Sequence, residues 1–127
     1  TVYVGIADGA DDDNQLLYVG ASIPTPIEGL SLGVAYDDRE SAEGDAEATA
    51  IYATYGLSET MNLGLRYDTL EDDRAGAWEG DTRSQLTATL GVALFDNVLT
   101  RIEYTAEDGN RAGGSSNGFA VNAFYAF

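Results

Sequence analysis

A two-residue alternation of large apolar side chains with small or polar ones limits what this chain can fold into. It is clearest in two segments, whose large apolar residues are Leu30, Leu32, Val34 and Tyr36, then Leu86, Ala88, Leu90, Val92 and Leu94. Successive side chains of a β-strand point to opposite faces of a sheet, whereas a helix repeats every 3.6 residues. Six further segments alternate in the same way, so the sequence predicts eight strands.

The breaks between these segments indicate how the strands are connected. Four long acidic stretches that contain glycine, at 8–14, 37–47, 68–83 and 105–117, alternate with short breaks at 24–29, 57–62 and 95–98. We expect the long stretches to be loops and the short ones tight turns. Such connections are too short for crossovers, and closing an antiparallel sheet removes its exposed edges. We therefore predict a single domain over residues 1–127, an all-β, up-and-down antiparallel barrel of eight strands.

The second face of these strands decides which side points outward. It consists of Gly, Ala, Ser and Thr with few charges, whereas a soluble surface carries about 25–35% charged side chains. Small residues suit the filled interior of a narrow barrel, so we predict that the large apolar face meets lipid. The charged residues expected inside are Asp37, Arg66, Asp68, Arg101 and Glu103. This lumen charge cluster either lines a selective path or, as we favour, forms structural ion pairs.

Aromatic residues on the apolar face are expected to mark the two membrane interfaces. Four lie toward one end of the strands, namely Tyr36, Tyr67, Tyr104 and Phe119, and three toward the other, namely Tyr55, Tyr125 and Phe127. Rings at a bilayer interface keep their apolar body in lipid and their hydroxyl in water. We predict two aromatic rings about 25 Å apart, the height of an outward apolar band.

Composition excludes several function classes. The chain has a formal net charge of −16, and it contains no His, no Cys and only six basic residues. Nucleic-acid binding needs clustered cations, and most catalytic sites use groups that are missing here. We therefore predict no nucleic-acid partner, no cofactor and no enzymatic activity.

Two loop features could form a binding site, but neither feature is specific for one. Asp8, Asp11, Asp12 and Asp13 could bind a hard cation such as calcium, but their spacing lacks the ligand pattern of an EF-hand loop. A solvated, mutually repelling loop is the favoured interpretation. Trp78 either anchors to lipid headgroups or packs within its own loop.

The final strand resembles a known family. Residues 119–127 alternate large apolar side chains and end in phenylalanine, which is similar to the closing strand of Gram-negative outer-membrane barrels. Tyr125 and Phe127 match that family's assembly signal, whereas Asn122 stands where glycine is usual and Ala120 where a polar residue is usual. The acidic, glycine-rich style resembles porin-type barrels, and the size resembles the eight-stranded OmpA and OmpX class.

This resemblance implies a location and partners. It implies a barrel in the bacterial outer membrane, with periplasmic termini, in contact with the lipid bilayer and lipopolysaccharide. It also implies recognition of the last strand by the barrel-assembly machinery. The first strand, at 1–7, is short, and the acidic, glycine-rich sequence resembles larger porins. We therefore expect the chain to be either a small barrel or the C-terminal part of a larger one. An oligomer or larger assembly is compatible with both.

Three functions follow, in order of preference. The first is an outer-membrane barrel of porin type, acting as a structural or passive-permeability element with acidic surface loops. The second is a cell-surface binding module whose acidic loops capture cations or a partner. The third is a soluble β-barrel carrier of apolar ligands. Because about eight strands leave only a filled interior, we expect a single barrel to conduct ions poorly, with cations favoured.

Overall fold

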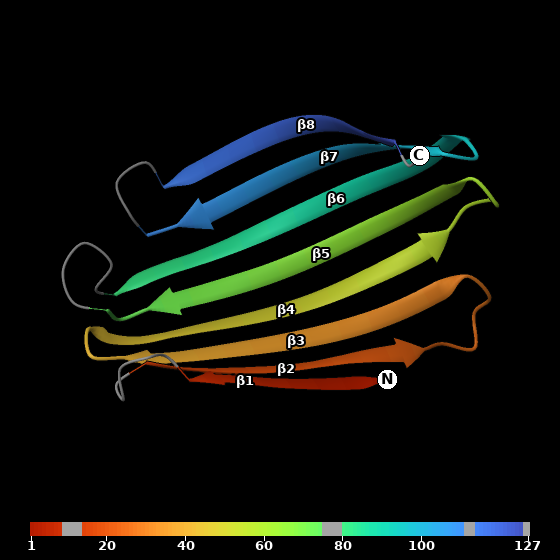
Figure 1. The fold of residues 1–127 in the computed structure, drawn as a ribbon. Helices are drawn as coiled ribbons and strands as arrows, with labels where there is room; N and C mark the ends of the chain where they lie inside the picture. The colour runs from red at the N-terminus through yellow and green to blue at the C-terminus, as the bar shows by residue number, and fades with distance from the viewer. Residues whose placement is uncertain (9–13, 75–79, 111–113, 126–127) are drawn as a thin grey trace.

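The chain forms one antiparallel β-sheet in which the strands follow each other in sequence order (Figure 1). The computed structural model describes residues 1–8, 14–74, 80–110 and 114–125. The strands are β1 (Val2–Asp8), β2 (Gln15–Pro24), β3 (Leu30–Ser41), β4 (Gly44–Gly56), β5 (Met61–Asp72), β6 (Asp81–Phe95), β7 (Val98–Gly109) and β8 (Ser115–Tyr125). Among these residues no helix has the length and hydropathy to cross a bilayer. The prediction of eight antiparallel up-and-down strands is confirmed.

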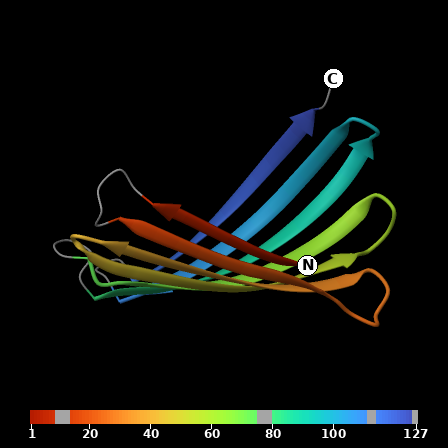
Figure 2. The ribbon, with the colours of Figure 1, turned by 60° about the horizontal axis from the view of Figure 1, so that its bottom comes forward.

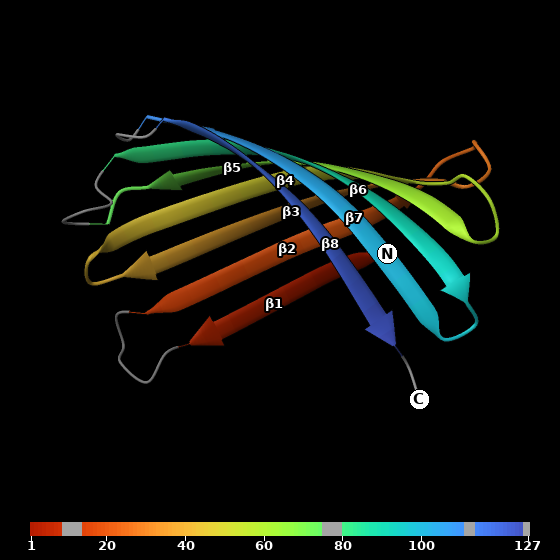
Figure 3. The same cartoon turned by 90° about the horizontal axis from the view of Figure 1, so that it is seen from above.

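The sheet is open, so the prediction of a closed barrel is wrong for this structure. β1 and β8 do not pair, whereas neighbours in sequence pair along seven or more positions. Figure 2 shows a curled trough, and in Figure 3 β7 and β8 pass across the line of β2–β4. Turns bring sequence neighbours together at little entropic cost, but β1 and β8 are separated by most of the chain. Their closure therefore has no local determinant.

The strands extend further into the acidic stretches than the sequence predicts. The expected long loop at 37–47 is a hairpin, in which β3 continues to Ser41 and β4 starts at Gly44. Gly44 has a φ of 121°, a conformation that glycine adopts without strain. The backbone ladder continues here because its hydrogen bonds do not depend on apolar side chains. We call the end of the sheet with the β1–β2, β3–β4, β5–β6 and β7–β8 connections the loop end, and the opposite end the turn end.

The pairing register places most large apolar side chains of the eight strands on one side of the sheet. Seven large apolar or aromatic residues lie on the other side, namely Tyr3, Leu16, Tyr18, Tyr52, Leu70, Leu99 and Phe124. Directly opposed residues share a face, and such a row runs from Leu32 to Ala53, Leu65 and Ala88. We call this the apolar face and the other the polar face. The polar face has a corresponding row from Gly33 through Tyr52 and Arg66 to Thr87. A register slip of one residue would exchange the two faces along a whole strand.

Burial is confined to the polar face. The buried residues of the described chain are Gly20, Gly33, Ala50, Asp72, Asp81 and Gly91, and the register assigns all of them to the polar face. Large side chains of the apolar face are exposed instead, including Ile51 at 59% and Val121 at 61%. We infer that the polar face lines the sheltered side of the trough. The chain exposes 8802 Å², about a third more than the roughly 6500 Å² of a compact chain of this mass.

A glycine and a tyrosine fit together at the centre of the polar face. The Tyr52 ring of β4 lies over Gly33 of β3, and a Cβ at position 33 would overlap its ring carbons. The ring covers backbone that would otherwise face the hollow of the trough. Gly33 is therefore required for close approach of the ring and not for a turn.

We predict that Gly33→Ala destabilises the sheet while Gly56→Ala does not. Overpacking costs about 1–3 kcal/mol, whereas a surface substitution stays within about 0.5 kcal/mol. A Cβ at Gly56 meets nothing within 4 Å. Urea unfolding followed by circular dichroism measures both. Tyr52→Ala combined with Gly33→Ala should recover part of the loss, and no recovery would contradict ring overlap as the cause.

Candidate functional site

The charged residues predicted inside the barrel all lie on the polar face, but they do not form one cluster. Arg66 Nε is 3.2 Å from Asp68 Oδ2, which is an ion pair along β5. The Arg101 guanidinium lies over the Phe124 ring, 5.2 Å from its centroid. Within the described residues, Arg101 makes no ion pair. The structure therefore separates the predicted cluster into local contacts along β5 and β7.

Glu103 and Asp37 complete the predicted set. Glu103 of β7 accepts a hydrogen bond of 3.2 Å from the Thr89 hydroxyl of β6, which lies directly opposite in the register. Asp37 of β3 is half-buried and has no ion-pair partner in the described part of the chain. The carboxylates at positions 37 and 103 therefore keep acceptor capacity for water or a solute.

A polar hollow of about 290 Å³ lies on this face between β4 and β7. Its side chains include an aromatic ring, a guanidinium, an amide, a carboxylate and several hydroxyls, from Tyr52, Thr54, Arg66, Gln85, Thr87, Thr89, Glu103 and Thr105. This arrangement offers both donors and acceptors of hydrogen bonds. It can hold water or small polar solutes.

The most buried charges were missed by the sequence reasoning. Asp72, at the end of β5, and Asp81, at the start of β6, lie opposite each other at the loop end, exposed by only 1% and 2%. Arg74 donates to both carboxylate oxygens of Asp72, at 2.9 and 2.5 Å. Arg83 donates to Asp81, at 2.7 Å from its Nε. The arginine two positions after each aspartate is the signal that could have revealed these pairs.

Each of these buried aspartates is paired with an arginine, and the hydrogen bonds from Arg74 hold the pKa of Asp72 below its ordinary value. Two carboxylates at directly opposed positions repel each other, and burial also disfavours their charged form. Each guanidinium offsets this cost with charge-assisted hydrogen bonds. The hydrogen bonds to Asp72 raise the pKa of Arg74 above its ordinary value, so the arginine stays charged. Each pair joins residues two positions apart in the chain, one pair at the end of β5 and the other at the start of β6.

The aromatic residues of the apolar face follow a regular diagonal toward the loop end. Tyr36 of β3 is level in the register with Thr69 of β5, so Tyr67 lies two positions nearer the turn end. Tyr67 is level with Ala106 of β7, and Tyr104 again lies two positions nearer the turn end. The strands of a barrel are tilted relative to its axis. Residues at the same height along that axis are therefore shifted by about one position from each strand to the next.

The aromatic residues toward the turn end follow a parallel diagonal. Tyr55 of β4 is level with Val121 of β8, and Tyr125 lies four positions nearer the turn end across four strands. Phe119 lies directly opposite Tyr104 and joins the first diagonal. On β8 the two diagonals are six positions apart, about 20 Å along the strand. The aromatic borders are thus closer together than the predicted 25 Å.

Beyond the two aromatic diagonals, the side chains of the apolar face become polar only toward the loop end. There the same face becomes acidic, with Asp38, Glu47, Glu71 and Asp108. Toward the turn end it stays apolar, and on β6 the apolar stretch runs from Leu86 to Leu94, about 27 Å along the strand. The apolar surface is thus longer than the distance between the aromatic borders.

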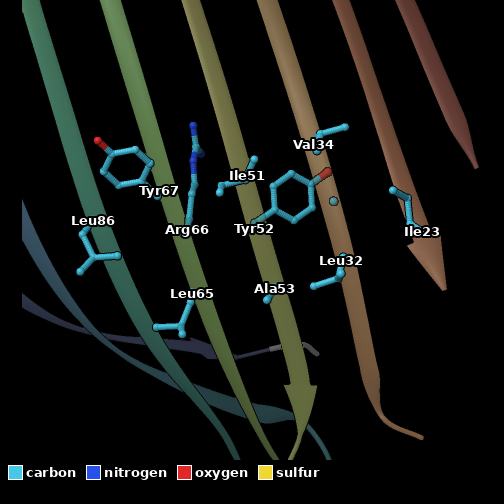
Figure 4. Close-up of a pocket in the computed structure, with 11 residues that line it drawn as sticks. Ile23, Leu32, Val34, Ile51, Tyr52, Ala53, Leu65, Arg66, Tyr67 and Leu86 are labelled. Carbon is cyan, nitrogen blue, oxygen red and sulfur yellow. The ribbon is translucent and has the colours of Figure 1, made fainter. Parts of the chain in front are cut away.

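A shallow groove of about 400 Å³ runs across this apolar surface from β2 to β6. Figure 4 shows its apolar side chains, which are Ile23, Leu32, Val34, Ile51, Ala53, Leu65, Tyr67 and Leu86. Three residues of the polar face also line it, namely Gly33, Tyr52 and the charged Arg66. The lining of the groove is therefore mostly, but not entirely, apolar.

Several predicted site residues cannot be placed. Asp11, Asp12, Asp13, Trp78 and Phe127 lie outside the described residues, and of Asp8 only the backbone, at the end of β1, is described. Among the residues that are described, no three potential ligands gather into a metal site. The favoured solvated loop, its calcium-binding alternative and the two roles of Trp78 are therefore untested.

Comparison with known proteins gave no relative. No protein-family model matches the chain, and neither the curated proteins nor the solved structures gave a match. The function must therefore be argued from the two faces of the sheet.

We predict that Arg74→Ala lowers the urea midpoint of unfolding more than Arg66→Ala. Arg74 is the hydrogen-bonded partner of a carboxylate that is 1% exposed, whereas the partner of Arg66 is 26% exposed and can be hydrated. Asp72→Asn in the Arg74→Ala background should restore stability, because it removes the unpaired buried charge. Equal losses from the two arginine variants would show that Asp72 finds another partner or water.

Proposed function

We propose that this chain forms the wall of an outer-membrane β-barrel of porin type, and acts as a structural or passive-permeability element. One observation carries the proposal. A continuous exposed apolar face, bordered by two parallel aromatic diagonals, backs onto a polar face that holds every buried residue of the described chain. Lipid on one side and water on the other satisfy both faces.

The energetics of the apolar face favour a bilayer over water. Burial of a side chain such as Leu or Val is worth about 1.5–3 kcal/mol, and this sheet leaves a full face of them exposed. A soluble barrel that carries apolar ligands needs the opposite arrangement, with large apolar residues enclosed. The single buried apolar residue of the described chain is Ala50. These exposures support the membrane proposal over the carrier.

The change of character at the loop end supports an orientation. Tyr36 and Asp38 are consecutive on the same face, one at the aromatic border and one beyond it. Aromatic rings favour the interface, and carboxylates favour the water beyond it. We therefore propose that the loop end faces the outside of the cell, against lipopolysaccharide, and that the turn end faces the periplasm.

The acidic loop end supports cation selectivity for any solute path along the polar face. Most acids of the chain lie toward this end, and the net charge is −16. Charges of one sign around an opening raise the local concentration of counter-ions. At about 0.1 M salt their electrostatic field is screened beyond about 10 Å. A surface module that captures cations would use the same charges, so neutralising them separates the two functions. Altered conductance favours permeation, and lost binding favours capture.

The membrane proposal is tested most directly by the environment that the purified chain needs. We expect it to be monodisperse in detergent, to aggregate without it, and to insert into lipid vesicles with protection of the strands from protease. A monodisperse, folded chain in plain buffer would overturn the proposal.

We predict that Leu90→Arg blocks insertion, whereas Thr89→Arg is tolerated. Leu90 lies on the apolar face between Leu63 and Ile102, and an arginine in mid-bilayer costs about 2–4 kcal/mol. Thr89 is its neighbour on the polar face, directly opposite Glu103, where an arginine gains a carboxylate. Folding yield in vesicles measures both variants. Equal yields would mean that the faces are assigned wrongly.

Because residues 119–127 resemble the closing strand read by the barrel-assembly machinery, we expect deletion of Phe127 to slow membrane assembly in cells. The same deletion should change the stability of the refolded protein little. Pulse-chase labelling of the membrane fraction measures the rate, with Tyr55→Ala as an aromatic control outside the last strand. An unchanged rate would remove the assembly role.

A further inference from the structure

We propose that two copies of this chain close one barrel of sixteen strands, in which β8 of each copy pairs with β1 of the other. The inference rests on the proposed function and deepens it, because it names the partner that covers the two free edges. The edge strands, the even number of strands and the charges of the polar face support this assembly.

Both edge strands lack the features that prevent pairing. Natural edges are blocked by Lys, Arg or Pro, by bulges, or by a covering segment. Neither β1 nor β8 contains Lys, Arg or Pro, and the one acid in the two strands is Asp8 at the end of β1. The register irregularity of the sheet lies between Ala93 and Phe95, away from both edges. Two unblocked edges in one sheet indicate that each is paired when the protein functions.

The geometry makes the opposite edge of another copy a matching partner. With an even number of strands in up-and-down order, β1 and β8 run in opposite directions, so β8 can extend the sheet antiparallel to a second β1. The second copy is related to the first by a half-turn about the barrel axis, so the apolar face of both copies points outward. Val2, Val4 and Ile6 of one copy then continue the apolar face of Phe119, Val121 and Ala123 of the other. Both junctions are identical, which closes the assembly.

The curvature and charges of the sheet fit the wider barrel better than a closed monomer. Each copy needs to supply only half of the circumference, and the sheet in Figure 2 is curled but open. About eight strands enclose a side-chain-filled interior, where charges must be paired. Here neither Asp37 nor Arg101 has an ion-pair partner among the described residues. About sixteen strands surround water, which can solvate these groups.

Disulfide trapping between copies tests the junction, and the natural chain contains no cysteine that could interfere. Val4→Cys in β1 is refolded into vesicles with an equal amount of a second variant. The second variants carry one cysteine on the apolar face of β8, at Phe119, Val121, Ala123 or Tyr125. The control mixture pairs Val4→Cys with Leu65→Cys of β5, an apolar-face position away from both edges. After oxidation, covalent dimers are measured on non-reducing gels.

We expect at least one β8 partner to give several-fold more mixed dimer than the Leu65→Cys control. The best partner defines the register. A chain carrying both Val4→Cys and that best β8 cysteine should give dimers joined at two junctions. An oxidised monomer from the double variant, with no mixed dimer in any combination, would show that one chain closes on itself. That outcome overturns the inference and leaves the membrane proposal standing, whereas failure to insert overturns both.

Conductance provides a second measurement on the trapped dimer. A sixteen-stranded barrel should conduct steadily in planar bilayers, with a preference for cations that falls as salt is raised. Trapped dimers that insert without conducting would contradict an aqueous lumen. The uncross-linked protein serves as the matched control.

Discussion

Backbone hydrogen bonding between neighbouring strands is the interaction on which everything else in this protein depends. Almost no side chain is buried behind the sheet, and Ala50 is the one buried apolar residue in its described part. The ladder alone fixes which residues are opposite each other, through pairs of seven or more positions. Because both edges lack a partner, the ladder is also incomplete. In the proposed membrane location, unpaired backbone groups at these edges would be costly, so the constraint that forms the sheet would also require its closure.

The register converts a simple alternation into two surfaces of different polarity. Opposed residues share a face, so apolar side chains from every strand merge into one continuous surface. The aromatic diagonals follow the same register, with Tyr36 and Tyr67 offset as tilted strands require. A slip in one strand would place its charges among the apolar side chains of its neighbours. The faces are therefore specified collectively, and each strand constrains the next.

Polar contacts adjust this framework at particular places. At the centre, Tyr52 fills the space that Gly33 leaves open. At the loop end, two buried aspartates are each held by the arginine two positions further along the chain. Between these points, Glu103 and Asp37 keep acceptor capacity on the polar face.

The sequence by itself determined the strand count, the antiparallel order and the membership of each face, because these follow from a two-residue period and from short connections. It did not reveal the opposed pair Asp72 and Asp81, since residues nine positions apart meet only through the register. It also placed a loop at 37–47 where the ladder continues. Only the tertiary structure decided the stagger of the aromatic borders and the open edges. Alternation is a local property of the chain, whereas stagger and closure depend on how strands distant in sequence come together.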